Sequence, residues 1–183
     1  MKWLRFLLFP LAFLAGCAIV ALMGAVFVVA VTYPQLPSLD TITDYQPKIP
    51  LRVYTAEGTL IGEFGEERRT VVAIKSVPAT LKNAILAAED ERFYQHSGVD
   101  YVGVMRAAYH NVSSGGRRQG ASTITMQVAR NFFLSTEKTL TRKLYEAMLS
   151  YKIEANLSKE QILELYVNQI YLGQRAYGFA AAA

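Results

Sequence analysis

Four short polar clusters follow one another between residues 89 and 168, and their side chains could together carry out one kind of reaction. They cover residues 89–98, 120–130, 142–146 and 162–168. The set supplies two well-placed carboxylates, a patch of hydroxyl and amide groups, and a run of cations. A carboxylate can serve as general base for a weak hydroxyl nucleophile, and cations can stabilise a departing diphosphate. The combination suits glycosyl transfer from a sugar diphosphate.

The segments around these clusters predict a mainly helical domain with a small β element. Apolar side chains recur at helical spacing, and Ser158 forms a capping box with Gln161. Alternating residues at 51–54 and 59–64 flank a glycine turn and predict a hairpin, and residues 69–74 could add another extended piece. Helices are expected at residues 78–89, 100–113, 122–134, 139–155 and 158–170.

The start of the chain predicts a membrane anchor. Residues 6–39 contain no charged side chain, and the apolar stretch 6–31 exceeds the roughly 20 residues that cross a bilayer core. Lys2 and Arg5 precede it, and the positive-inside bias keeps such residues in the cytoplasm. We therefore expect a single-pass protein with a cytoplasmic N-terminus and the remainder outside the cytoplasm.

Two alternatives to an uncleaved anchor exist. One is a cleaved signal peptide. The other is a lipoprotein site, because residues 14–17 end in Cys17 in a suitable context. The apolar run continues through residues 18–31 without a polar break, so length favours the anchor. As the single cysteine, Cys17 excludes an internal disulfide framework and a cysteine-based metal cluster.

The formal net charge of +4 is unevenly distributed. Residues 117–143 are strongly basic, which is typical of a solvated face or of a surface for anionic headgroups or a phosphorylated lipid. Nucleic acid is an unlikely partner because a segment outside the cytoplasm would not meet it. The basic residues are Arg117, Arg118, Arg130, Lys138, Arg142 and Lys143, against Glu137 alone.

These features predict three regions. Residues 1–33 form a short cytoplasmic tail and transmembrane anchor, and residues 34–75 a linker with the small β element. Residues 76–183 form the domain that carries the polar clusters. The four alanines at 180–183 look like the middle of a helix, so the domain is expected to be incomplete at its C-terminus.

The four clusters resemble the motifs of the peptidoglycan glycosyltransferase family, the polymerase module of class A penicillin-binding proteins and of monofunctional transglycosylases. The match runs from about Arg52 to the end of the chain, and an anchor followed by this module fits the N-terminal part of a class A protein. The resemblance implies a mainly α, lysozyme-like fold with a small β element near the membrane. It also implies a bacterial cytoplasmic (inner) membrane protein with a periplasmic or extracellular catalytic domain.

The resemblance also implies a reaction. The family transfers a growing glycan from undecaprenyl pyrophosphate to the 4-hydroxyl of the GlcNAc of lipid II, with inversion at the donor MurNAc. The implied partners are lipid II, the lipid-linked glycan, the membrane and other proteins of cell-wall synthesis, and the phosphoglycolipid moenomycin is the implied inhibitor.

Two glutamates match the family's catalytic positions. Glu89 is assigned as the general base, and its place at the end of an apolar helix predicts burial that would raise its pKa. Glu146 follows Arg142 and Lys143 by four and three residues, on one helix face. An ordinary surface ion-pair cluster is the alternative for this group. The resemblance implies instead that the two cations hold pyrophosphate, and that Glu146 positions them or helps to hold a divalent cation (Mg or Mn).

The other matching residues are assigned to substrate binding or its support. Asp90 is expected to orient its neighbours, Phe93 to pack under the site and His96 to serve as a hydrogen-bonded structural residue. The fourth cluster is expected to be mostly structural, with Glu164 or Asn168 tying its helix to the site. The full substrate-binding set is Asp90, Phe93, His96, Ser122, Thr123, Gln127, Arg130, Arg142 and Lys143.

Two competing functions come from other classes. A lytic transglycosylase or lysozyme-like hydrolase needs an acid over the glycosidic oxygen but no pyrophosphate clamp, so the cations favour synthesis. A non-catalytic membrane scaffold of the cell-wall machinery would suit the anchor, but the retained Glu89 and Glu146 argue against it.

Overall fold

The computed structural model describes residues 2–43, 45–48, 50–113, 120–134 and 139–183, with only the backbone for residues 2–8. The chain divides into two compact units, Met1–Pro37 and Ser38–Ala183. In the first unit, α1 (Lys2–Thr32) is followed by a single 3-10 turn at Tyr33–Gln35. Within the described part of the chain, one helix, Phe9–Gln35, is long and apolar enough to cross a membrane. Its length and composition fit the predicted anchor.

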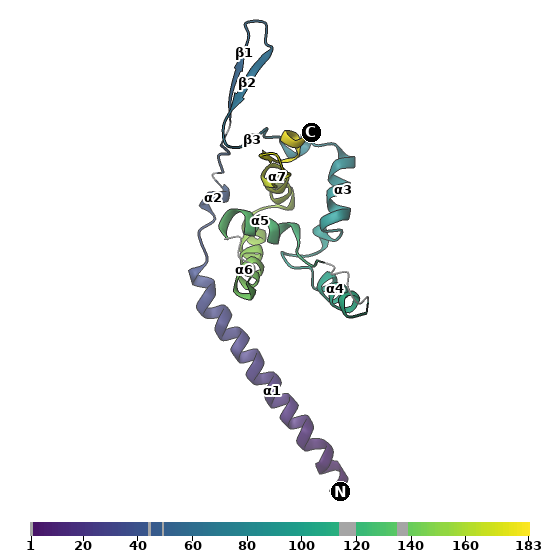
Figure 1. Cartoon of the computed structure of the whole chain (residues 1–183). Coiled ribbons are helices and arrows are strands. Elements are labelled where there is room, and N and C mark those ends of the chain that lie inside the picture. Colours follow the sequence, from purple (N-terminus) through teal and green to yellow (C-terminus); the bar gives the residue numbers. More distant parts are fainter. Residues whose placement is uncertain (1, 44, 49, 114–119, 135–138) are drawn as a thin grey trace. The chain divides into compact units, whose positions relative to one another are not determined.

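The second unit is built mainly from helices, which confirms the predicted fold class (Figure 1). Short polar caps start three of them. The hydroxyls of Thr123 and Thr139 accept hydrogen bonds from the first turns of α5 and α6, and Ser158 and Gln161 form the predicted capping box of α7. The helices are α2 (Asp40–Thr43), α3 (Ala79–Glu89), α4 (Tyr101–Ser113), α5 (Ile124–Phe133), α6 (Leu140–Asn156), α7 (Lys159–Gln169) and α8 (Phe179–Ala182), with 3-10 turns at Ile74–Ser76 and Phe93–Gln95.

The hydrophobic core lies where α5 packs against α6 and α7. Ile124 and Val128 of α5, Leu149 of α6, and Ile162 and Leu163 of α7 are all fully buried. Their spacing is helical, and their burial contributes to the hydrophobic stabilisation of the domain. Three of the four polar clusters are thereby held on one packed body.

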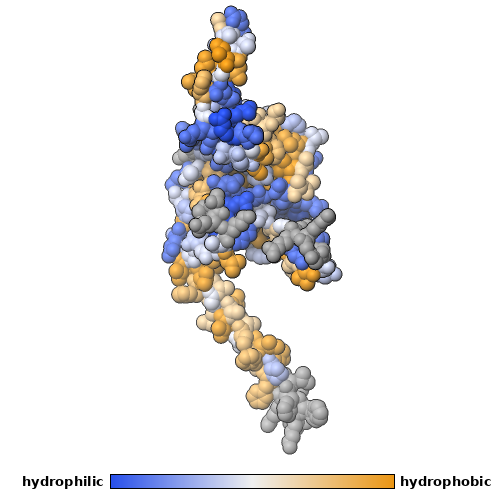
Figure 2. All heavy atoms as spheres, in the orientation of Figure 1, coloured by the Kyte–Doolittle hydropathy of each residue, from blue (hydrophilic) through white to orange (hydrophobic). Residues whose placement is uncertain are grey.

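The small β element is a hairpin of β1 (Leu51–Tyr54) and β2 (Leu60–Phe64), antiparallel as predicted. Its apolar side chains are largely exposed, and they form the apolar patches on the hairpin in Figure 2. A second pairing joins β3 (Arg68–Arg69) in parallel to β4 (Ala176–Tyr177). Of the extended piece predicted at 69–74, Arg69 lies in β3 and Ile74 begins a 3-10 turn. The prediction of a strand there is thus only partly confirmed.

Arg69 of β3 is a buried polar hub. Its guanidinium donates to Glu67 at 2.6 Å, to the Gln169 side chain at 2.7 Å and to the Tyr45 hydroxyl at 2.9 Å. It also lies 4.4 Å from the centre of the Tyr177 ring. The hub fastens the segment after Pro37 to the end of α7 and to β4.

Candidate active site

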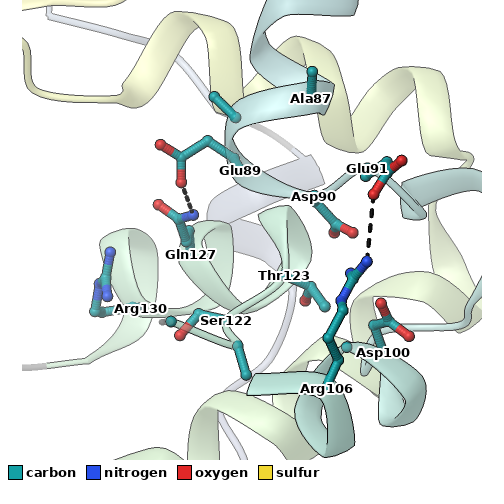
Figure 3. Close-up of a pocket in the computed structure, with 14 residues that line it drawn as sticks. Ala87, Glu89, Asp90, Glu91, Asp100, Arg106, Ser122, Thr123, Gln127 and Arg130 are labelled. Atoms are coloured by element: carbon teal, nitrogen blue, oxygen red, sulfur yellow. Dashed lines mark hydrogen bonds and ion pairs between the residues drawn. The ribbon is translucent and has the colours of Figure 1, made fainter. Parts of the chain in front are cut away.

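A cleft of about 490 Å³ opens between the end of α3, the start of α4 and the start of α5 (Figure 3). Its wall is mainly polar and combines carboxylates, hydroxyls, an amide and two guanidinium groups. The first and second polar clusters therefore meet in one place. The lining residues are Ala87, Ala88, Glu89, Asp90, Glu91, Asp100, Gly103, Arg106, Gly120, Ala121, Ser122, Thr123, Gln127 and Arg130.

Glu89 is the last residue of α3 and points into this cleft. Its Oε2 accepts a hydrogen bond of 2.7 Å from Nε2 of Gln127, which stands one turn into α5 (Figure 3). The burial predicted for Glu89 is wrong, since the residue is exposed. The apolar residues of α3 end before Glu89, and the Glu89 carboxylate therefore lies outside the core, at the open side of the cleft.

Asp90 joins the end of α3 to the start of α5. Its carboxylate accepts from the backbone N–H of Ile124 at 3.0 Å, where the dipole of α5 favours negative charge. Both of its oxygens lie 3.0 Å from Nε2 of His96, whose side chain is 5% exposed. Phe93 is fully buried beside them, with the Lys159 ammonium 4.3 Å from its ring centre. These contacts form a connected support beside the cleft, and the roles of the three motif residues stay predictions.

Thr123 and Gly98 fix the loop that follows Asp90. The Thr123 hydroxyl donates to the carbonyl of Gly98 and accepts from the N–H of Met126 at 3.2 Å. Gly98 has φ of +98°, and a Cβ there would lie 2.8 Å from Oγ of Ser150 on α6. Only glycine allows so close an approach in that conformation.

The third cluster forms a buried charge group on α6. Glu146 is 0% exposed, with Nζ of Lys143 at 2.7 Å and Nε of Arg142 at 3.1 Å. The Arg142 contact is an ion pair without hydrogen-bond alignment. Lys143 also donates to the Ser122 hydroxyl on the cleft wall. A surface ion-pair cluster is therefore the wrong description, and the buried pair presents a half-exposed ammonium beside the cleft.

The predicted divalent cation finds no protein-made site in the described part of the chain, where no three His, Cys, Asp or Glu side chains gather as ligands. Of the predicted basic run, Arg117, Arg118 and Lys138 lie outside the described residues.

Some residues near the cleft are missing from the predicted set. Arg106 lines it from α4. Tyr166 of α7, which the sequence placed among structural residues, is 1% exposed. Burial raises the pKa of its hydroxyl, the charge of Glu89 raises the pKa further, and that of Arg130 lowers it. The Tyr166 hydroxyl is thus close enough to Glu89 and Arg130 for their charges to act on its pKa. The sequence did not indicate this, because Tyr166 recurs with the apolar residues of its helix.

Glu164 and Asn168 lie away from the cleft. Glu164 accepts from the N–H of Ile74 at 2.7 Å. Asn168 bonds both the N–H and the carbonyl of Val72, at 2.9 and 2.8 Å. They fasten α7 to the segment that precedes α3. The expectation that one of them ties α7 to the site stays a prediction.

Comparison with known proteins bears on this arrangement. The family model described as Transglycosylase matches residues 57–183. The chain belongs to the transglycosylase family. The chain is 63% identical over 155 residues to penicillin-binding protein 1A of Neisseria cinerea. The aligned region covers 85% of this chain and 19% of that protein. The chain is 48% identical over 184 residues to penicillin-binding protein 1A of Escherichia coli K12. That aligned region covers 100% of this chain and 21% of that protein.

The chain spans about a fifth of the length of the curated relatives it matches. The family and the relatives confirm the predicted enzyme class, a peptidoglycan glycosyltransferase. Together with α1, the relatives are consistent with a single-pass inner-membrane protein. The three domain boundaries and the site assignments stay predictions.

Proposed function

We propose that this transglycosylase polymerises glycan chains from lipid II. The growing chain on undecaprenyl pyrophosphate is the donor, and lipid II is the acceptor. The observation that carries the proposal is the pairing of an exposed, hydrogen-bonded Glu89 with the Lys143–Glu146 group beside the same cleft. A hydrolase would have no use for the cations of that group.

Glu89 takes the proton from the 4-hydroxyl of the acceptor GlcNAc. Gln127 holds one carboxylate oxygen, which leaves the other free to face the hydroxyl. The acceptor oxygen then forms a bond to C1 of the donor MurNAc as the bond from C1 to the phosphate oxygen breaks. The configuration at C1 inverts from α to β, and the electron pair leaves with the diphosphate.

Arg142 and Lys143 stabilise the charge of the departing diphosphate. A buried carboxylate fixes both cations, so they need no reorganisation when charge develops. Lys143 also contacts Ser122, which extends this group to the cleft wall. Asp90, His96 and Thr123 act as the frame that holds α5 against the end of α3.

The outer face of α4 supports action at a membrane surface. Tyr101, Met105, Tyr109 and Val112 repeat at helical spacing and are 64%, 73%, 79% and 87% exposed, while Ala107 on the other side is buried. Aromatic and apolar side chains on one exposed face are typical of an interfacial helix. We propose that this face of α4 lies at the membrane surface, with the N-terminus in the cytoplasm and the domain outside it.

The test is polymerisation of lipid II by the full chain in lipid vesicles, with Glu89→Gln and the control Glu57→Gln in the exposed hairpin turn. The parent and the control should make glycan chains, and Glu89→Gln should lower the rate by about 10²–10⁴-fold. Circular dichroism checks that all three proteins are folded. A parent that makes no glycan would refute the function, and an active Glu89→Gln would refute the base.

A further inference from the structure

Two arginines line the cleft, one from α5 and one from α4. Figure 3 shows Arg130 of α5 on one side and Arg106 of α4 on the other, with Glu89 nearer to Arg130. The two buried carboxylates of the wall are already engaged: Asp90 with His96, and Asp100 with Arg92 at 3.6 Å. Among the described residues of that side, Arg106 is the guanidinium that lines the cleft.

The start of α4 is shaped to bring Arg106 to the cleft. Gly103 lies one turn before Arg106, on the same side of the helix. A Cβ at Gly103 would lie 2.5 Å from Oδ2 of Asp100, the residue just before the helix, so glycine leaves room there for the Asp100 side chain. Ala107, the next residue, is buried against the body. Gly103 and Arg106 both line the cleft, and Arg106 is the long, charged side chain of the two.

The present partner of Arg106 is weakly held. Its Nη1 lies 3.5 Å from Oε2 of Glu91, and the two side chains are 52% and 71% exposed. An exposed pair of that length contributes little to stability. Exchange of Glu91 for an anionic group of a ligand is therefore easy, and a guanidinium can bind phosphate or carboxylate oxygens in pairs.

The proposed reaction needs a second cationic site. Donor and acceptor are both anionic, and Arg142 and Lys143 are committed to the departing diphosphate of the donor. We propose that Arg106 exchanges Glu91 for an anionic group of the acceptor, either its diphosphate or a carboxylate of its peptide. The inference rests on the proposed function and adds a binding residue for the second substrate.

The experiment uses the full chain in vesicles and a donor glycan whose terminal 4-hydroxyl is blocked, so that only the acceptor concentration varies. Arg106→Ala should raise the acceptor KM by about tenfold or more, with kcat close to that of the parent. Arg106→Lys should lie between the two, because it keeps the charge and loses the paired geometry. Arg68→Ala is the matched control, since Arg68 is 49% exposed and pairs with Glu63 at 3.9 Å outside the cleft.

Two acceptor analogues identify the group that Arg106 holds. One carries amidated peptide carboxylates, and the other a neutral linker in place of the diphosphate. The parent and Arg106→Ala should have the same acceptor KM for the analogue that lacks the group bound by Arg106. A difference that persists with both analogues would overturn the inference, as would an unchanged acceptor KM in an active Arg106→Ala protein. If the parent neither polymerises lipid II nor binds the acceptor in a titration, the proposed function falls together with Arg106.

Discussion

Glu146 is a carboxylate with no access to water and two cations against it. Removing a charge from solvent is costly, and the cost is offset only when partners remain in place. The group therefore carries a structural role as well as the proposed chemical one. Both roles should respond to a single substitution.

Glu146→Gln should lower both stability and activity. Loss of the charge leaves Arg142 and Lys143 facing a neutral amide, and we expect the free energy of unfolding to fall by about 2 kcal/mol. We also expect a lower rate of lipid II polymerisation, because the cations lose the group that positions them. Urea denaturation and the vesicle assay measure the two effects.

Glu160→Gln provides the comparison for that substitution. Glu160 is exposed on α7 and accepts a hydrogen bond from Tyr94. The same chemical change there should alter the unfolding midpoint only slightly. Equal losses in the two variants would contradict the structural role given to the buried charge.

At the scale of elements, the loop after α3 depends on one close approach to α6. Gly98 combines φ of +98° with the narrow gap at Ser150. We expect Gly98→Ala to lower the free energy of unfolding by about 3 kcal/mol, because the new Cβ meets both a disfavoured backbone region and Ser150. Thermal or urea denaturation measures the loss.

Gly58 separates the two causes. It has φ of +84°, and a Cβ there would meet nothing within 4 Å. Gly58→Ala therefore reports the backbone cost alone, expected at about 1 kcal/mol. If both alanine variants lose the same stability, the contact with Ser150 is not what requires glycine at 98.

The helices were predictable because their signals are local. Apolar spacing and the caps at Thr139 and Ser158 mark the starts of α6 and α7 within a residue or two. The pairing of Glu146 with Arg142 and Lys143 was predictable for the same reason, since helix geometry fixes it.

Contacts between distant residues were not predictable in this way. The bond from Ile124 to Asp90 spans 34 positions, and nothing in the local pattern marks it. The exposure of Glu89 depends on what faces the end of α3, and the charges of Glu89 and Arg130 act on Tyr166 because of how α7 packs. The matching motifs predicted Asp90 and Glu89 as site residues. Their contacts and exposure could not be predicted, because they depend on how distant segments pack.

At the scale of the whole molecule, the described residues expose apolar side chains along α1, on the β1–β2 hairpin and on the outer face of α4, and water does not favour such exposure. Figure 2 shows exposed apolar atoms on α4. If α4 lies in the headgroup region, a polarity-sensitive dye at position 105 should report an apolar environment. We expect a blue-shifted emission from a Met105→Cys label in vesicles, on a Cys17→Ala background.

A label at Glu160→Cys is the reference for a position in contact with water. Its emission should stay that of a solvated dye in vesicles and in detergent alike. Matching emission at 105 and 160 in vesicles would contradict an interfacial α4. The comparison does not depend on polymerisation, so it tests the surface independently of the cleft.

The buried hub at Arg69 has a mechanical consequence. If the proposed function holds, the protein is anchored in a bilayer while its product joins a growing wall, and a pull on the product would load the segment that follows Pro37. Tyr45 is bonded to both Arg69 and Gln169, so tension on that segment acts on α7 and β4 together. Several bonds would then carry the force together, and they would not break one after another. The segment beyond Tyr45 would therefore resist unfolding.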